Sequence, residues 1–488
     1  MTTRTDDLAV DPVFADATEC ARAVREREVS SRELLDALLE RVERLDGATN
    51  AVVTLDAERA RARADAADRA TASGRSWGPL HGVPMTVKDV WETEGLRTTS
   101  GAPELADHVP ATDALAVGRL RSAGAVIFGK TNTPLYAGDV QTHNEVFGTT
   151  GNPWDPARTP GGSSGGAAAA LAAGLTPFEL GSDIGGSIRM PSHLCGTFGL
   201  KPSWGVVPSR GHIPGGLVET DVNQGGPMAR SVRDLGLGLD VLSGPLPEDA
   251  GAWRLELPGP EAPVDVTGLR IDLVLDDPDG PVSAEVRDVI RAGADRLADA
   301  GARVVERPLP VPLAELVASW RAPVLPIVGA GLPDGTYDEL AATAALIEGD
   351  DPGSQALRSL TSSYRAHRAA DQVRQRQRAR WAERFAEADV VVAPALPVTA
   401  FPHDTATTMP ERTLDVDGRT VPHLDLVAWC GGIGAVLLPV AAVPFGISAE
   451  GLPVGAQLIG PYLQDRSVLA AAEAVTRVLG GFVAPPGY

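Results

Sequence analysis

Two stretches rich in glycine and serine decide the fold expected for this chain: TPGGSSGGAAAALAAG at 159–174 and ELGSDIGGSIRMPSHLCGTFGLKPSWG at 179–205. In the first, glycines that permit unusual backbone angles flank Ser163 and Ser164. The alanine run that follows predicts a helix that is apolar on all sides and therefore buried. In the second, a segment with little side-chain bulk leads to Ser187. Both stretches place serine hydroxyls in loops next to segments that are expected to be buried.

The segment before Ser187 indicates an anion-binding turn. The backbone N–H groups of Ile184, Gly185, Gly186 and Ser187 can point into one concavity and hold a developing oxyanion. Each such donor contributes roughly 3 to 4 kcal/mol to transition-state binding. An ordinary turn has the same local sequence, so this segment alone does not decide between the two.

A third stretch, HGVPMTVKDV at 81–90, ends a short apolar run on Lys88. The only other lysines are Lys130 and Lys201, and all remaining basic residues apart from the histidines are arginine, a bias that a GC-rich genome also produces. A retained lysine indicates a position where guanidinium cannot serve, because a buried lysine can lose its proton near neutral pH. Taken alone, Lys88 also fits a surface salt bridge.

The first stretch fits two other motifs less well. A phosphate-binding loop is also rich in glycine, but the lysine after its second glycine is missing here. Residues 161–165 satisfy the GxSxG pattern of the α/β-hydrolase nucleophile elbow, in which Ser163 would be the nucleophile. That elbow needs a strand directly before it, whereas NPWDPARTP at 152–160 is rich in proline and turn residues.

The three stretches together resemble the amidase-signature family. Further similar segments are GAVIFGKTN, GPMARSVRDL, ADVVVAPALPVTAFPHD and GLPVGAQLIGP. The resemblance is strong over 79–235 and recurs over 388–466. It implies an α/β fold made of a single large domain, with a central mixed β-sheet of many strands covered by helices on both faces.

Residues 1–488 are thus expected to form one domain with four regions. These are N-terminal helices over 1–75, a signature core over 79–240, a variable substrate-covering region over 245–385, and C-terminal strands and a helix over 386–488. Local signals agree with this division. Ser30 and Glu33 have the spacing of a capping box, and Ser283 can cap a later helix.

By motif position, the resemblance implies that Lys88 is the catalytic base, that Ser163 is a bridging serine after a cis peptide bond, and that Ser187 is the nucleophile. A serine hydroxyl needs an adjacent base, and no histidine is placed to act. A neutral Lys88 would take a proton from Ser187 through Ser163, which would then protonate the leaving nitrogen. The resemblance also implies three supporting residues: Ser164, Asp183 and Arg189.

The expected function is hydrolysis of a carboxylic amide through an acyl-enzyme, with anilides, esters and carbamates as related substrates. One alternative is the glutamine amidotransferase subunit of a tRNA-dependent complex, although no segment resembles the conserved C-terminal motifs of that subunit. Another is a non-catalytic binding protein with the same fold, which would be expected to lose a member of the triad.

The net charge of −21 disfavours contact with nucleic acid phosphates or anionic lipid. We therefore expect a small-molecule amide as the partner, no nucleic acid, no membrane, and a monomer or homodimer. The N-terminal sequence has no signal-peptide pattern, so we expect a cytoplasmic location. The arginines at 374, 376, 378 and 380 are expected to form a solvated helix face.

No metal or cofactor is expected. Cys20, Cys195 and Cys430 are scattered and are interpreted as small buried hydrophobic residues, and no HExxH motif occurs. Substrate specificity is expected to come from residues near 136–144, 320–331 and 425–433. The apolar residues of the last stretch fit a pocket lining or ordinary core packing equally well: Leu426, Val427, Trp429 and Ile433.

Overall fold

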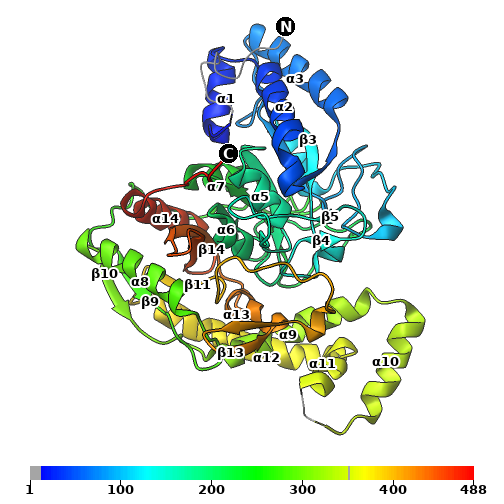
Figure 1. Cartoon of the computed structure of the whole chain (residues 1–488), viewed down its shortest axis with the longest axis vertical. Helices are drawn as coiled ribbons and strands as arrows, with labels where there is room; N and C mark the ends of the chain where they lie inside the picture. The colour runs from blue at the N-terminus through cyan, green and yellow to red at the C-terminus, as the bar shows by residue number, and fades with distance from the viewer. Residues whose placement is uncertain (1–12, 350–351) are drawn as a thin grey trace.

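The computed structural model of the protein describes residues 13–349 and 352–488 (Figure 1). Its largest sheet consists of β6 (Phe178–Asp183), β7 (Phe198–Lys201), β8 (Gln224–Ala229), β9 (Arg270–Leu273), β10 (Arg303–Glu306), β11 (Val390–Pro394), β14 (Val440–Ile447) and β15 (Pro453–Ile459). The strand order is β10-β9-β11-β15-β14-β7-β8-β6. Strand β9 is parallel to β10 and β11, and the other neighbours are antiparallel, so the sheet is mixed.

Helices cover both faces of this sheet (Figure 1). Helices α5 (Gly165–Ala172) and α6 (Arg189–Cys195) pack together on one face, and α7 (Val232–Leu242), α8 (Ala284–Asp299) and α14 (Asp465–Leu479) pack together on the other. Every residue of α5 is buried, as its apolar sequence predicts. The Ser283 side chain caps α8. The expected single-domain α/β fold is confirmed.

A second, smaller sheet positions Lys88. Strands β1 (Val52–Leu55), β2 (Pro84–Lys88) and β3 (Val126–Thr131) pair in the order β1-β3-β2, and β2 also contacts β6 of the large sheet. Helices α1 (Ala17–Glu26), α2 (Ser31–Thr49), α3 (Ala57–Ala72) and α4 (Leu115–Ser122) complete this part. The capping box of Ser30 and Glu33 is present at the start of α2.

The middle of the chain is helical. It contains α9 (Leu313–Ala330), α10 (Asp334–Leu346), α11 (Pro352–Leu360) and α12 (Tyr364–Arg384). Strands β12 (Thr413–Val416) and β13 (Arg419–Pro422) follow as a hairpin before α13 (Ala428–Ala435), and two short strands, β4 (His143–Asn144) and β5 (Gly148–Thr149), pair separately.

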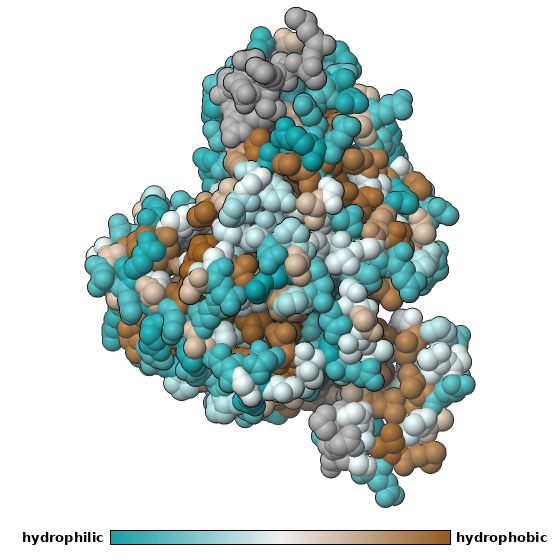
Figure 2. Space-filling view, viewed as in Figure 1, coloured by the Kyte–Doolittle hydropathy of each residue, from teal (hydrophilic) through white to brown (hydrophobic). Residues whose placement is uncertain are grey.

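Helices α10 and α11 form a lobe that projects from the body (Figure 1). This lobe exposes apolar surface, including Leu346, which is 82% exposed (Figure 2).

Among the described residues, α9 alone is long and apolar enough to cross a membrane. Core helices pass the same test of length and composition, so this finding is weak by itself. In the structure, α9 packs against α11, α12 and α13.

The arginine-rich face of α12 differs in part from the expectation. Arg374 is buried, and its guanidinium forms salt bridges with Asp371 and Asp221. Residues 374, 377 and 381 share one helix face, which packs inward because it also carries Trp381. The expectation of a solvated face is therefore wrong for Arg374.

Candidate active site

Lys88 lies at the end of β2 and is completely buried. Its ammonium nitrogen Nζ donates hydrogen bonds to Ser163 Oγ at 2.7 Å and to Ser182 Oγ at 3.0 Å. Burial lowers the pKa of Lys88 from its ordinary 10.5 to about 7, against the opposing effects of Asp183 and Glu179. A substantial fraction of Lys88 is therefore a neutral amine near neutral pH, which is the state required of a general base.

Ser163 lies in the loop before α5, and the Gly162–Ser163 peptide bond is cis, as expected. A side chain at Gly162 would place its Cβ only 2.4 Å from the Asp139 carbonyl oxygen, so this position has room only for glycine. The residues directly before Ser163 form no strand. The loop therefore lacks the context of an α/β-hydrolase elbow, and Ser163 instead faces the lysine.

Ser187 lies in the turn between β6 and α6 and is 7% exposed. Its carbonyl oxygen accepts a hydrogen bond from the N–H of Ser164 at 3.1 Å, which holds the two serine-rich loops together. The Ser164 hydroxyl donates to the Ser182 carbonyl oxygen at 3.3 Å. Lys88, Ser163 and Ser187 thus come from three segments that the fold brings to one place, and Ser164 braces two of them.

Asp183 organises the turn that contains Ser187. Its carboxylate accepts hydrogen bonds from the backbone N–H groups of Gly186 at 2.8 Å and Ile188 at 3.1 Å, and from the Arg189 guanidinium at 2.7 Å. Burial alone would raise the pKa of Asp183, but the charge and hydrogen bond of Arg189, together with the Lys201 charge and the Ile188 N–H, more than offset it, so the pKa lies below its ordinary value. The turn is therefore built around a buried carboxylate.

One of the four expected oxyanion donors is already engaged. The N–H of Gly186 donates to Asp183, so it is not free to bind an oxyanion, and the expectation is wrong for this residue. Within the described chain, the N–H groups of Ile184, Gly185 and Ser187 have no hydrogen-bond partner. These three groups remain available to a substrate oxygen.

Arg189 connects this turn to the C-terminal strands. It donates to the Cys430 carbonyl oxygen at 2.8 Å and to Gln457 Oε1 at 2.7 Å, and Gln457 donates in turn to the Pro394 carbonyl oxygen at 2.7 Å. Nothing in the sequence indicates the contact with Gln457, because the two residues are 268 positions apart in the chain.

Two further residues lie at the site: Ser182, which no motif indicated, and Trp320, which begins the stretch 320–331 expected to set substrate specificity. Ser182 provides the second hydrogen bond to Lys88. Trp320 on α9 donates its indole N–H to the Ile184 carbonyl oxygen at 2.7 Å, and a Cβ at Gly185 would lie 2.8 Å from its ring. Trp320 therefore packs directly over the turn that carries the free N–H groups.

The apolar residues of 425–433 lie in the core. Leu426, Trp429 and Ile433 are at most 1% exposed, and Val427 is buried with Leu426 in the same apolar cluster. Ordinary core packing therefore accounts for Leu426, Val427 and Ile433, whereas Trp429 also lines a small cavity of about 80 Å³. The three cysteines are also buried and free, as expected.

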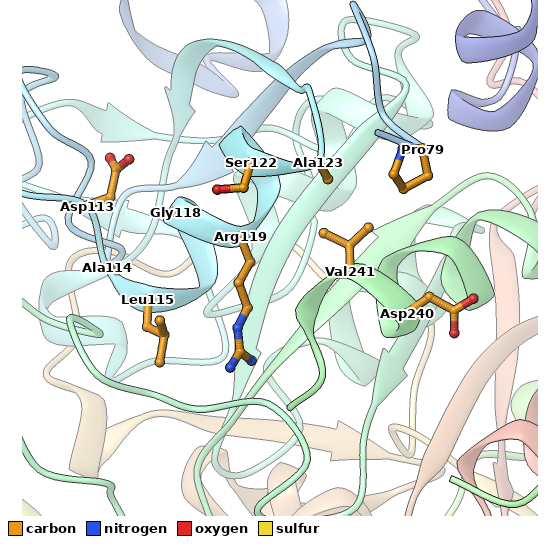
Figure 3. A pocket seen from close by; sticks show the side chains of 10 residues that line it. All are labelled: Pro79, Asp113, Ala114, Leu115, Gly118, Arg119, Ser122, Ala123, Asp240 and Val241. Carbon is orange, nitrogen blue, oxygen red and sulfur yellow. The ribbon is translucent and has the colours of Figure 1, made fainter. Parts of the chain in front are cut away.

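A surface cleft of about 600 Å³ lies elsewhere, between α4 and α7 (Figure 3). Its walls include Asp113, Leu115, Arg119 and Val241. The Arg119 guanidinium is occupied by backbone carbonyls, among them that of Pro245 at 2.6 Å. No member of the Lys88, Ser163 and Ser187 group lines this cleft, so the buried serines remain the candidate site.

The fold is α/β with a mixed sheet, and a buried lysine is hydrogen-bonded to a serine that follows a cis peptide bond. Together these features define the class of amidase-signature enzymes. The family model described as Amidase matches residues 33–469, and the chain belongs to this family. It is an enzyme that hydrolyses amide C–N bonds.

Known proteins similar to the chain include amidotransferase subunits and independent amidases. The glutamyl-tRNA(Gln) amidotransferase A subunit of Roseiflexus sp. (strain RS-1) is 38% identical, over 94% of this chain and 96% of that protein. The structure of a bacterial aryl acylamidase of the amidase-signature family is 27% identical, with a TM-score of 0.80 over 96% of this chain and 97% of that one. The structure of the corresponding amidotransferase protein from Thermotoga maritima is 26% identical, with a TM-score of 0.78 over 98% and 99%.

These relatives correct one expectation. We expected neither nucleic acid nor partner subunits, but the name of the Roseiflexus protein describes one component of a larger enzyme and includes a tRNA. The net charge is a weak basis for such an exclusion, because exposed charges are screened over about 10 Å and local surfaces differ from the average. The expectation is therefore wrong and is withdrawn.

Proposed function

We propose that the chain forms an acyl-enzyme on Ser187, with Lys88 as the base and Ser163 as the proton relay. The observation that carries this proposal is the 2.7 Å hydrogen bond from a completely buried lysine to Ser163, beside the turn that presents Ser187. Ser187 Oγ bonds to the amide carbon while its proton moves to Ser163, whose own proton moves to Lys88. The proton then returns from Lys88 to Ser163, and Ser163 protonates the leaving nitrogen of the amide as the C–N bond breaks. Water then hydrolyses the acyl-enzyme and releases the acid.

The N–H groups of Ile184, Gly185 and Ser187 would hold the oxyanion of this intermediate. Fixed N–H donors lower the barrier because they need no reorganisation when the charge develops. Asp183 supports them by holding the turn through Gly186 and Arg189.

For the substrate, we propose the side-chain amide of glutamine, with the chain acting as the glutamine-hydrolysing component of a larger amidotransferase. The similarity to the Roseiflexus amidotransferase proteins over nearly their whole length supports this assignment. The exposed apolar surface of the α10 and α11 lobe is of the kind that partner subunits cover (Figure 2). We place this reaction in the cytoplasm.

A second candidate is an independent amidase for an apolar or aryl amide. It is favoured by the apolar surroundings of Ile184, which packs with Trp320, Trp204 and Leu437. Helix α9, from the region 245–385, provides Trp320, which agrees with a substrate-covering role for that region. The similarity to an aryl acylamidase points the same way.

Ammonia release from glutamine and aniline release from an acyl anilide distinguish the two candidates. Each assay uses the wild-type chain and Ser187→Ala, and the glutamine assay is repeated with the other subunits of an amidotransferase and tRNA(Gln). Ser187-dependent ammonia release that rises in the assembly supports the first candidate. Anilide hydrolysis without glutamine hydrolysis under either condition rejects it in favour of the second.

A further inference from the structure

The indole of Trp320 packs directly against two glycines beside the turn that carries Ser187. A Cβ added at Gly185 would lie 2.8 Å from the indole ring, and a Cβ added at Gly431 of α13 would lie 2.9 Å from it. Both backbones therefore approach the ring as closely as they can. The indole N–H donates a hydrogen bond of 2.7 Å to the Ile184 carbonyl oxygen. The seat of Trp320 is thus defined by close packing and by one directional bond.

This bond fixes the orientation of the peptide unit between Ile184 and Gly185. The unit is planar and trans, so its C=O and N–H groups point in opposite directions. Because the carbonyl oxygen is held by the indole, the Gly185 N–H points away from Trp320. Within the described chain this N–H has no hydrogen-bond partner. Trp320 therefore orients a donor that stays available to a substrate oxygen.

The following peptide units of the turn are held by a different group. The N–H of Gly186 donates to the Asp183 carboxylate at 2.8 Å, and the N–H of Ile188 donates to the same carboxylate at 3.1 Å. These bonds orient the backbone on either side of Ser187. The unit between Ile184 and Gly185 lies outside this network, and its carbonyl oxygen accepts the bond from Trp320 instead.

The same bond strengthens the Gly185 N–H as a donor. Hydrogen bonds in a chain polarise one another, by roughly 10 to 30% per bond. Here the chain would run from the indole N–H to the Ile184 carbonyl, and from the Gly185 N–H to the oxyanion. Donors of this kind lower a barrier because they are already in place when the charge develops. A fixed and polarised N–H is therefore a better oxyanion donor than a free one.

We infer that Trp320 is a positioning residue of the oxyanion site, which orients and polarises the Gly185 N–H through the Ile184 carbonyl. This inference rests on the acyl transfer to Ser187 proposed above. Trp320 itself does not touch the reacting atoms. It belongs to α9, which also packs against α13, so the oxyanion site is complete only when α9 is seated on the turn. The position of this helix therefore affects the rate of acyl transfer.

The test replaces Trp320 with benzothienylalanine, which has nearly the same shape but carries sulfur in place of the indole N–H. A fluorophosphonate probe labels Ser187 at several probe concentrations, which separates the maximal labelling rate from the affinity for the probe. The phosphoryl oxygen of the probe occupies the oxyanion site while Ser187 Oγ displaces fluoride. The maximal rate should fall about 10-fold, less than the roughly 10²- to 10³-fold cost of removing a donor outright, because the Gly185 N–H remains but is less well oriented.

Two phenylalanine variants accompany this test. Trp320→Phe keeps an aromatic ring without the N–H and should slow labelling at least as much. Trp154→Phe is the matched control, because Trp154 also donates its indole N–H to a backbone carbonyl, that of Cys195, at 3.1 Å. Cys195 lies at the end of α6 that is remote from Ser187. The control should therefore leave the maximal labelling rate unchanged.

A merely structural hydrogen bond would change the fraction of active protein, and hence the extent of labelling, but not the maximal rate. An unchanged maximal rate in the benzothienylalanine variant would therefore overturn the inference. A change confined to probe affinity would also overturn it, because Trp320 would then contact the probe directly. If Trp320→Phe does not fold, the benzothienylalanine variant, which retains the packing against both glycines, carries the test alone. Absence of Ser187 labelling in the wild type would instead reject the proposed function, and this inference with it.

Discussion

Replacing Lys88 with methionine should abolish activity and yet stabilise the folded protein at low pH. In the unfolded chain the lysine holds its proton up to its ordinary pKa of 10.5, whereas in the fold it loses the proton near 7. At pH 6 the fold therefore bears nearly the whole cost of a buried ammonium. At about 1.4 kcal/mol for each pH unit between the two pKa values, this cost is about 5 kcal/mol.

The sign of the pH dependence follows from proton binding. Between pH 7 and 10.5 the unfolded chain holds the proton that the fold has released, so the free energy of unfolding of the wild type rises with pH. By pH 9.5 the remaining cost is about 1.4 kcal/mol. The methionine variant loses the hydrogen bonds to Ser163 and Ser182, worth about 1 kcal/mol each at any pH.

The free energy of unfolding of the Lys88→Met variant should thus exceed that of the wild type by about 3 kcal/mol at pH 6. This difference should vanish by about pH 9.5. Urea unfolding of both proteins at the two pH values measures it. Arg75→Met, which removes an exposed cation, is the control and should show no such change. A difference between Lys88→Met and the wild type that stays constant with pH would refute a depressed lysine pKa, and with it Lys88 as a neutral base.

Three further predictions concern the serine loops. Ser187→Ala should abolish fluorophosphonate labelling. Ser163→Ala should slow labelling about 10²-fold or more and leave Ser187 as the labelled residue by mass spectrometry. A label on residue 163 in the wild type would contradict this. Asp183→Asn should lower the free energy of unfolding by about 3 to 5 kcal/mol in urea titrations, because it leaves a buried guanidinium unpaired, and wild-type stability would show that the ion pair is dispensable. Gly162→Ala should slow labelling of Ser187 sharply, because the new Cβ would lie 2.4 Å from the Asp139 carbonyl oxygen and displace the loop; an unchanged labelling rate would argue against that reason.

The parts of the fold that were predictable have local signals. The capping box at Ser30, the Ser283 cap and the buried alanine helix each depend on residues within a few positions of one another. The positions of Lys88, Ser163 and Ser187 followed from motif resemblance. The contact between Lys88 and Ser163 followed from the same resemblance and is present; periodicity alone could not have indicated it, because it carries no information about which loops meet.

The contacts that were not predicted act over long separations or through backbone geometry. Trp320 reaches Ile184 across 136 positions, and nothing in the sequence of α9 indicates that contact. Two errors had a local signal that could have prevented them. An aspartate three residues before a glycine often accepts that glycine's N–H, as Asp183 does from Gly186, and the spacing of Arg374 from Trp381 places both on one helix face.

The burial of Lys88, Lys130 and Lys201 has a practical consequence, because it leaves no lysine at the surface. Reagents that acylate amines should leave the lysines of the native protein unmodified, so such chemistry will not cross-link or immobilise it through lysine. The low background of lysine modification can therefore be used to measure opening of the interior over time. Any lysine that becomes modified reports that the interior around the serines has opened, and the rate of modification measures how often it does.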